Sequence, residues 1–343
     1  MNLFSICKDS GDFWALKAEQ DFGIPYRELL LIPASNNHGR YNFIYDIKDP
    51  NTGLIEASRI GSLSLVKYCL KKEPSDLGSK KALSLAAKNG HLDVVKYLVG
   101  LGADFHDEDP LSLAAKNGHL NIVKYLVKQG ADFQNALISA AESGHLNITR
   151  YLVMKGADFQ NALISAASYD RLDVVKYLVK LGADIHARNE YALRSAAGNG
   201  RLDVVKYVVE QGADIHVMDE YALRWAAGNG HLNVVKYLVE RGADPYVRNE
   251  YALRWAAGNG HLDVVKYLVE QGADPHVRNE QALRWAAGNG HLDVVKYLVE
   301  QGADVHVKKE DALRLAVNER HLNVVKYLVE QGADPHVILK KNI

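Results

Sequence analysis

The chain has 343 residues, and its 41 Lys and Arg residues nearly balance its 42 Asp and Glu residues. This balance excludes a strong overall attraction to nucleic acid or to an anionic membrane, so we expect neither as a partner. Two cysteines, Cys7 and Cys69, are too few for a disulfide framework and favour an intracellular chain, in the cytoplasm or nucleus, with reduced thiols. The first residues lack the pattern of a secretory signal, and no stretch is long and apolar enough to span a bilayer.

Residues 1–50 do not repeat, and eight of them are aromatic. That density predicts a folded segment rather than a disordered tail. We expect these residues to form an N-terminal cap that covers the exposed face of the first repeat. The alternative is a separate small docking module.

From residue 51 to residue 337 one pattern recurs, and residues 338–343 follow it as a short C-terminal tail. The triplet Gly-Ala-Asp occurs at intervals of 28, 26 and 26 residues and then of 30 residues five times. The triplets begin at Gly102, Gly130, Gly156, Gly182, Gly212, Gly242, Gly272, Gly302 and Gly332. Counting a recurring tyrosine from Tyr68 to Tyr327 gives ten units. A fixed period in this range predicts a solenoid, in which each unit buries its apolar face against its neighbours.

Each unit is predicted to contain two short helices. In the unit that ends at Gly272, alanines and a leucine mark a first helix from about Glu250 to Gly258, with Asn249 as its N-cap. The spacing of valines and leucines predicts a second helix over Leu262–Glu270 with one buried stripe. Gly260 and Gly272 are expected to end these helices in the left-handed conformation. Helices of this length are marginal alone, so packing between neighbours must stabilise the array.

The sequence from Leu253 to Asp274, which contains Ala-Ala-Gly-Asn-Gly-His-Leu and Val-Val-Lys-Tyr-Leu-Val, resembles the ankyrin repeat family. The resemblance covers about residues 51–337, and the near-identical late repeats also resemble the ankyrin families of giant DNA viruses of amoebae. It implies stacked helix pairs, projecting β-turn fingers and a concave surface that binds other proteins.

The repeats depart from the family pattern in the connection that would form the finger. An ankyrin unit has about 33 residues, whereas the late units here have 30. Only seven residues run from Phe133 to Ser139 and from Phe159 to Ser165. We therefore expect an all-α ankyrin-repeat solenoid of about ten helix-turn-helix units, with shortened fingers after repeat five and none around residues 131–166.

The strongest candidate for partner binding is a set of aromatic and basic residues that recurs on the first helices. Trp and Arg are enriched in binding hot spots, and in the ankyrin family the first helices line the concave groove. The candidate residues are Arg194, Tyr221, Arg224, Trp225, Tyr251, Arg254, Trp255, Arg284 and Trp285. A structural interpretation stays open, because a glutamate stands four residues before each arginine at the spacing of a helical ion pair. The tryptophans would then pack against the next unit.

Two columns of histidines also recur, represented by His231 and His216. Equivalent positions in stacked units should lie about 8–10 Å apart, too far for several ligands of one zinc ion. We therefore predict a structural role for them and no metal. No nucleophile–base set or phosphate-binding loop stands out, so we expect no cofactor and no enzymatic activity.

These features predict a non-enzymatic scaffold that binds a protein or peptide on the concave face of repeats five to nine. One alternative is an adaptor in which residues 1–50 link a captured target to other machinery, for example a ubiquitin ligase. Another is self-association through the last repeat, because Val324–Val329 keeps the apolar sequence of the inner repeats instead of the polar face of a terminal cap.

Overall fold

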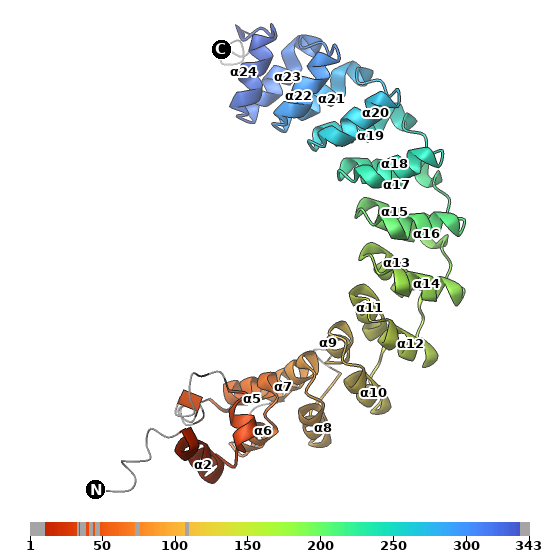
Figure 1. Cartoon of the computed structure of the whole chain (residues 1–343). Helices are drawn as coiled ribbons and strands as arrows, with labels where there is room; N and C mark the ends of the chain where they lie inside the picture. Colours follow the sequence, from red (N-terminus) through yellow and green to blue (C-terminus); the bar gives the residue numbers. More distant parts are fainter. Residues whose placement is uncertain are drawn as a thin grey trace. The chain divides into compact units, whose positions relative to one another are not determined.

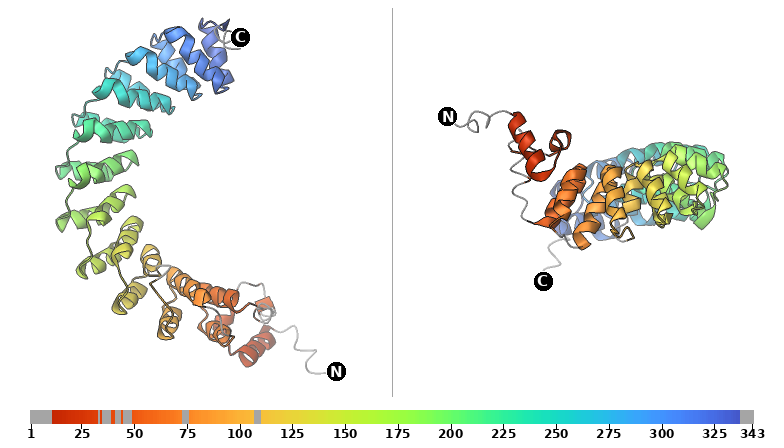
Figure 2. Two further views of the ribbon diagram at one scale, coloured as in Figure 1. Left: turned by 180° about the vertical axis from the view of Figure 1, so that it is seen from behind. Right: turned by 90° about the horizontal axis from the view of Figure 1, so that it is seen from below.

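The computed structural model of the chain describes residues 11–32, 34, 39–40, 44, 49–72, 76–106 and 110–336. The described elements are all helices, as the sequence predicts. The chain divides into two compact units, residues 1–162 and 163–343, and the boundary falls inside helix α13. Within each unit, helices lie in pairs that stack one after another (Figures 1 and 2).

Ten helix pairs occupy the described part of the chain from residue 50 onward, which confirms the predicted number of repeats. The first helices of the pairs are α5 (Pro50–Ile60), α7 (Asp76–Asn89), α9 (Pro110–Lys116), α11 (Gln134–Ser143), α13 (Gln160–Ser168), α15 (Ala187–Gly198), α17 (Val217–Gly228), α19 (Val247–Gly258), α21 (Val277–Gly288) and α23 (Val307–Asn318). The second helices are α6 (Leu63–Leu70), α8 (Leu92–Gly100), α10 (Leu120–Lys128), α12 (Leu146–Met154), α14 (Leu172–Lys180), α16 (Leu202–Glu210), α18 (Leu232–Glu240), α20 (Leu262–Glu270), α22 (Leu292–Glu300) and α24 (Leu322–Glu330).

The second helices have the predicted bounds, as α20 illustrates. Its stripe of Val264, Val265 and Leu268 is fully buried, and the Asp263 carboxylate accepts a hydrogen bond from the Val264 amide in the first turn. Gly272 follows with φ = 97°, a conformation that a side chain would disfavour. The predicted glycine termination is therefore confirmed.

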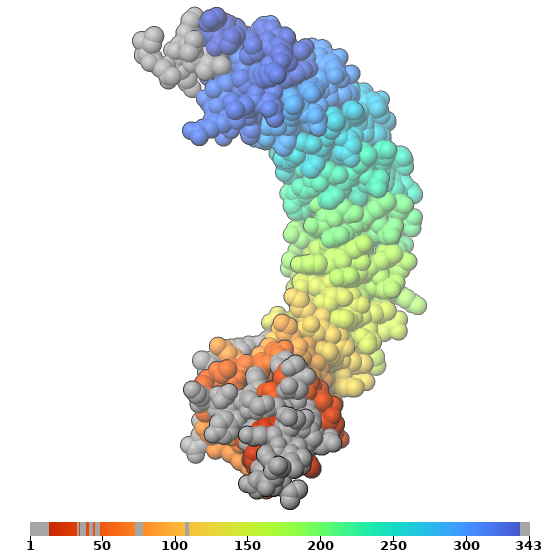
Figure 3. Space-filling view, turned by 60° about the vertical axis from the view of Figure 1, so that its left-hand side comes forward, coloured from red at the N-terminus to blue at the C-terminus, as the bar shows by residue number. Residues whose placement is uncertain are grey.

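The first helices pack against one another through small side chains. Ala252, Ala256 and Ala257 of α19 are all buried, and small residues let neighbouring helix backbones approach closely. Within residues 163–343, neighbouring first helices approach more closely than neighbouring second helices do. The stack of this unit therefore bends toward the side of its first helices (Figure 1), and its repeats form one continuous surface (Figure 3).

The connections contain no strands among the described residues, which agrees with the prediction of reduced fingers. In repeats six to ten, three consecutive residues within the first turn of each first helix as bounded above have positive φ and are not helical: residues 188–190, 218–220, 248–250, 278–280 and 308–310. We call each triplet a finger turn. Three consecutive non-glycine residues in this region are unfavourable, at about 1–2 kcal/mol each, so other contacts must stabilise the turn.

The finger turn corrects one prediction. Asn249 was expected to be the N-cap of its helix, but it lies in the middle of a finger turn with φ = 57°. Its Oδ1 instead accepts a hydrogen bond from Arg278 Nη2 of the next repeat, at 2.9 Å. The regular helix therefore begins after the turn, at about residue 251.

Before the first pair lie α2 (Gly11–Phe22) and α3 (Tyr26–Leu29). The Glu28 carboxylate of α3 accepts hydrogen bonds from the Ser62 hydroxyl and the Ser64 amide at the start of α6, both at 2.9 Å. Ile24 and Leu29 are fully buried. These contacts support the predicted cap, although much of residues 33–48 and the tail 338–343 lie outside the described residues.

Candidate interaction surface

Tyrosines and arginines of the first helices α15, α17 and α19 alternate in one continuous stack. The Arg194 guanidinium lies 5.1 Å from the ring centre of Tyr191 and 5.0 Å from that of Tyr221. The Arg224 guanidinium lies 5.2 Å from Tyr221 and 5.3 Å from Tyr251. Arg254 continues the series between Tyr251 and Trp285. We call Tyr191, Arg194, Tyr221, Arg224, Tyr251 and Arg254 the Tyr–Arg column.

The arginines of this column stabilise the finger turns. Arg224 Nε donates to the carbonyl of Asp219 at 2.7 Å, and its Nη2 donates to the carbonyl of Met218 at 2.8 Å. Arg194 and Arg254 make the equivalent pairs of bonds. The three side chains are buried, and burial lowers the pKa of Arg224 and Arg254 below the usual value. The arginines therefore fix the aromatic rings in place rather than extending into solvent.

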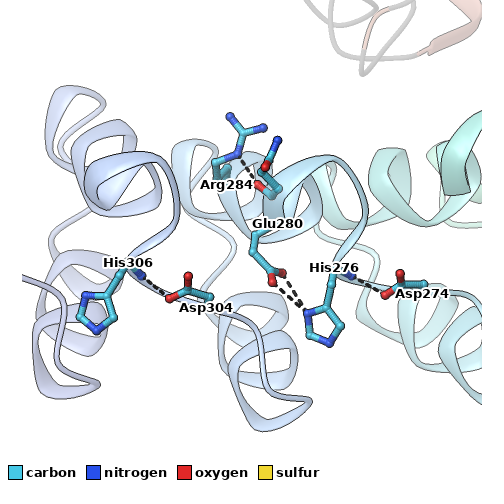
Figure 4. A network of polar contacts seen from close by, with 7 residues as sticks. Asp274, His276, Glu280, Arg284, Asp304 and His306 are labelled. Carbon is cyan, nitrogen blue, oxygen red and sulfur yellow. Dashed lines mark hydrogen bonds and ion pairs between the residues drawn. The ribbon is translucent and has the colours of Figure 1, made fainter.

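The ion pairs between each glutamate and the arginine four residues later, left open as the structural interpretation, are contradicted. Among the residues that the structure describes, none of these glutamates pairs with its arginine. In four repeats the glutamate instead bonds to the histidine four residues before it, as in His216 Nδ1 to Glu220 Oε1 at 2.6 Å. Figure 4 shows Glu280 and Arg284 pointing in opposite directions, because Glu280 reaches His276 with both oxygens.

These histidine–glutamate pairs combine an exposed ring with a buried carboxylate. The His216 side chain is 59% exposed and that of Glu220 only 4%. The hydrogen bond to the glutamate raises the pKa of His186, His216 and His306. Repeat eight differs because Tyr246 replaces the histidine and donates instead to the Gln271 carbonyl, at 2.6 Å. Burial accordingly raises the pKa of Glu250 in that repeat.

The tryptophans cross from one repeat to the preceding one. Each of Trp225, Trp255 and Trp285, which we call the Trp ladder, lies over a glycine at the end of the previous first helix. A Cβ on Gly198 would lie 2.7 Å from a ring atom of Trp225, and one on Gly228 would lie 2.6 Å from Trp255. The neighbouring indole therefore requires glycine at Gly198 and Gly228, whereas a Cβ on Gly258 would lie 3.3 Å from Trp285. The three rings remain half-buried.

The histidines at the starts of the second helices are structural, as predicted. His231 Nε2 bonds to the Gly198 carbonyl of the preceding repeat at 3.0 Å, and His119 and His145 make comparable bonds in residues 1–162. Burial lowers the pKa of His231 and His291. Within the described residues, no group of three or more His, Cys, Asp or Glu side chains has an arrangement that fits a metal ion.

Basic residues dominate the tips of the finger turns. These tip cations are Arg188, Arg248, Arg278, Lys308 and Lys309. All five are exposed. Asp219, in the finger turn of residues 218–220, is an exposed acidic residue, and its carboxylate pairs with Arg248 Nη2 at 2.6 Å. The sequence as a whole is balanced in charge, so this local excess of cations was not visible in its composition.

All nine residues proposed from the sequence thus lie on the four first helices α15, α17, α19 and α21. The residues predicted from the sequence do not include the tip cations, and the packing of each tryptophan on the preceding glycine was not predicted. The second relation has a signal in the sequence: Gly198, Gly228 and Gly258 precede Trp225, Trp255 and Trp285 by one repeat, while Ser168 precedes Ser195. The two serine hydroxyls contact each other at 2.6 Å.

Comparison with known proteins identifies the family. The family model described as ankyrin repeats (3 copies) matches residues 28–109, 111–189, 163–249, 193–279 and 253–338. None of the curated proteins searched matches the chain. None of the described helices has the length and apolar character needed to cross a membrane. The match over most of the chain and the ten stacked helix pairs show that this chain belongs to the ankyrin repeat family.

Proposed function

We propose that repeats five to nine form a scaffold that binds a protein or an extended peptide on the side of the first helices. The observation that carries this proposal is the Trp ladder together with the Tyr–Arg column. Half-exposed aromatic rings are held in position over consecutive repeats by buried arginines that are hydrogen-bonded to the finger turns. Rings that are already ordered lose little conformational entropy on binding, and aromatic side chains contribute strongly to hot spots. The ankyrin family is in general an interaction module and typically not enzymatic.

The tip cations extend the proposal to the charge of the partner. They are exposed at four of the five finger turns in this unit, so we infer a partner with acidic residues. Opposite charges at an interface mainly accelerate association and select the register. Binding should therefore weaken as the salt concentration rises.

A charge-reversal experiment tests this proposal. Peptides selected from a random library on the wild-type chain are titrated against a variant with Arg188→Glu, Arg278→Glu and Lys308→Glu. The matched control reverses Lys206, Lys236 and Lys266 on the second helices, which are also exposed. We expect the first variant to lose at least about tenfold in affinity and the control to bind as the wild type does. Equal affinities in both variants would remove the first-helix side from the proposal.

The adaptor function remains an alternative for residues 1–50. The bonds of Glu28 to the start of α6 favour a capping role for part of this segment. If deletion of residues 1–50 reduces solubility and a grafted foreign cap restores all binding, the adaptor idea fails. The resemblance to giant-virus ankyrin families is a proposal that rests on the wording of the late repeats alone.

Self-association through the last repeat has one supporting observation. Leu322 of α24 is 75% exposed, and Val329 of the same helix is 37% exposed. Light scattering over a range of concentrations tests it. A monomer at high concentration, or a Leu322→Glu variant that associates like the wild type, would exclude this face.

A further inference from the structure

The Trp ladder ends at repeat ten, where Leu315 occupies the position of the tryptophan. In the three preceding repeats an indole fills the space above the glycine of the previous helix. At the last step a Cβ on Gly288 would meet Leu315 at Cβ (3.3 Å), Cδ1 (3.7 Å) and Cγ (3.9 Å). The shorter side chain leaves part of the indole's space empty.

A pocket lies at this position. It has a volume of about 390 Å³ and is lined by Trp285, Gly288 and Leu315 on its apolar side. This volume is within the range of about 300–1,000 Å³ that is usual for sites of small ligands. The preceding repeats show which group fits here, because an indole occupies the same place above Gly198, Gly228 and Gly258.

The polar lining of the pocket favours a hydrogen-bond donor. In the inner repeats an asparagine covers the glycine carbonyl: Asn259 Nδ2 donates to Gly228 at 2.6 Å, and Asn289 Nδ2 donates to Gly258. Repeat ten has Glu319 at that position, and its carboxylate accepts hydrogen bonds but does not donate them when ionised.

The lining also contains Asn289, His321 and Arg284, and the arginine is already paired. Arg284 Nη1 donates to the Asp311 carboxylate at 2.8 Å, and Arg284 Nε donates to the Asn279 carbonyl at 2.9 Å. An anionic group would meet the Glu319 carboxylate of the lining, and the one arginine there is already paired with Asp311, so the lining disfavours a phosphate or a carboxylate.

We propose that this pocket binds an aromatic side chain that carries an N–H donor, the indole of a tryptophan in the partner. The ring takes the place of the missing fourth tryptophan above Gly288, beside Trp285, and its N–H donates to Glu319. This inference rests on the proposed scaffold function and adds to it the anchor residue of the partner and its position along the groove.

The test uses N-acetyl-tryptophanamide as the probe and the indole N–H signals of the protein as the readout. Titration of the ¹⁵N-labelled wild-type chain should shift the Trp285 signal with saturation, while the signals of Trp225 and Trp255 stay in place. The variant Leu315→Trp fills the pocket with a group that the three preceding repeats already accommodate. We expect it to bind the probe at least about tenfold more weakly than the wild type.

Leu181→Trp is the matched control, since Leu181 is 45% exposed and is not part of the pocket lining; it should bind the probe as the wild type does. Glu319→Asn, a second variant at an exposed position, restores the asparagine of the inner repeats and should also weaken binding. Absence of a saturable shift at Trp285 in the wild type, or equal affinity in Leu315→Trp, overturns the inference. Selected peptides that respond to reversal of the tip cations but not to Leu315→Trp would leave the scaffold function standing and remove this pocket alone.

Discussion

Replacement of Arg224 by alanine should release one finger turn. The change removes two hydrogen bonds from a charged donor to the carbonyls of Asp219 and Met218 and two cation–π contacts, with Tyr221 and Tyr251. Bonds to charged groups contribute about 1.5–3 kcal/mol each, and cation–π contacts contribute about 0.5–1 kcal/mol each at partly exposed sites. Because the freed carbonyls regain some hydration, we expect a local loss of about 3–4 kcal/mol.

The expected readout is hydrogen exchange of the amides around this turn. A loss of this size corresponds to exchange that is at least about 100-fold faster at residues 217–221, because the left-handed conformation is unfavourable without the arginine. Exchange in α22 and α24 should change little, since repeats couple mainly to their nearest neighbours.

Arg314→Ala provides the matched control for this experiment. Arg314 has the equivalent position in repeat ten, but among the described residues its side chain makes neither of the two bonds to its turn. Its replacement should accelerate exchange at residues 308–310 by much less than Arg224→Ala does at its own turn. Equal effects of the two substitutions, or no effect of Arg224→Ala, would refute the role of the buried arginines.

Three further predictions follow from the contacts between and within repeats. Because a Cβ on Gly228 would lie 2.6 Å from the Trp255 indole, Gly228→Ala should destabilise the array by about 1–3 kcal/mol in urea unfolding. Adding Trp255→Leu to the same chain should recover most of that loss, and additive effects of the two substitutions would contradict the contact. The hydrogen bond to Glu220 raises the pKa of His216, so the stability from this pair is fully present below about pH 6.5 and is lost as the pH rises through the higher pKa of the folded state. In urea titrations, the loss of unfolding free energy between pH 6 and pH 9 should be smaller for His216→Gln than for the wild type, and equal losses would refute this. Burial raises the pKa of the Cys69 thiol to about 11, so in a Cys7→Ser background iodoacetamide at pH 8 should label this thiol only after unfolding; rapid labelling of the native chain would be inconsistent with that burial.

The sequence alone predicted the repeated helix pair because its signals are local. The stripe of Val264, Val265 and Leu268 and the glycine at Gly272 each report on one element, and both agree with the structure. The number of repeats followed in the same way from the recurring tyrosine.

The finger turns were not predictable from the same reasoning. The interval of four residues occurs twice in each late repeat, from His216 to Glu220 and from Glu220 to Arg224. Spacing alone favoured the second pair, because both residues were placed on one helix. In the structure the left-handed residues before the helix direct Glu220 toward His216 and the Arg224 side chain toward the turn's carbonyls. An asparagine or aspartate in the middle of most turns was the available signal, since these residues tolerate positive φ.

Only part of the candidate surface could be predicted from the sequence, because the sequence shows residue types but not the backbone conformation that sets their contacts. Trp255 and Arg254 stand out as residue types that bind partners, so the sequence located the surface. It did not show that Arg254 is buried and bonded to the turn, because that contact depends on backbone conformation. The pocket beside Trp285 depends on a difference between repeats, Leu315 in place of tryptophan, and becomes visible only when the space above Gly288 is known.

The central claim is that the side of the first helices in residues 163–343 binds a partner. Hydrogen exchange of the chain, with and without a saturating peptide selected from a random library on the wild type, tests it most directly. The account predicts slower exchange in residues 217–228, 247–258 and 277–288 and unchanged exchange in the outward-facing turns of α18, α20 and α22. Protection confined to the second helices or to residues 11–32 would contradict it.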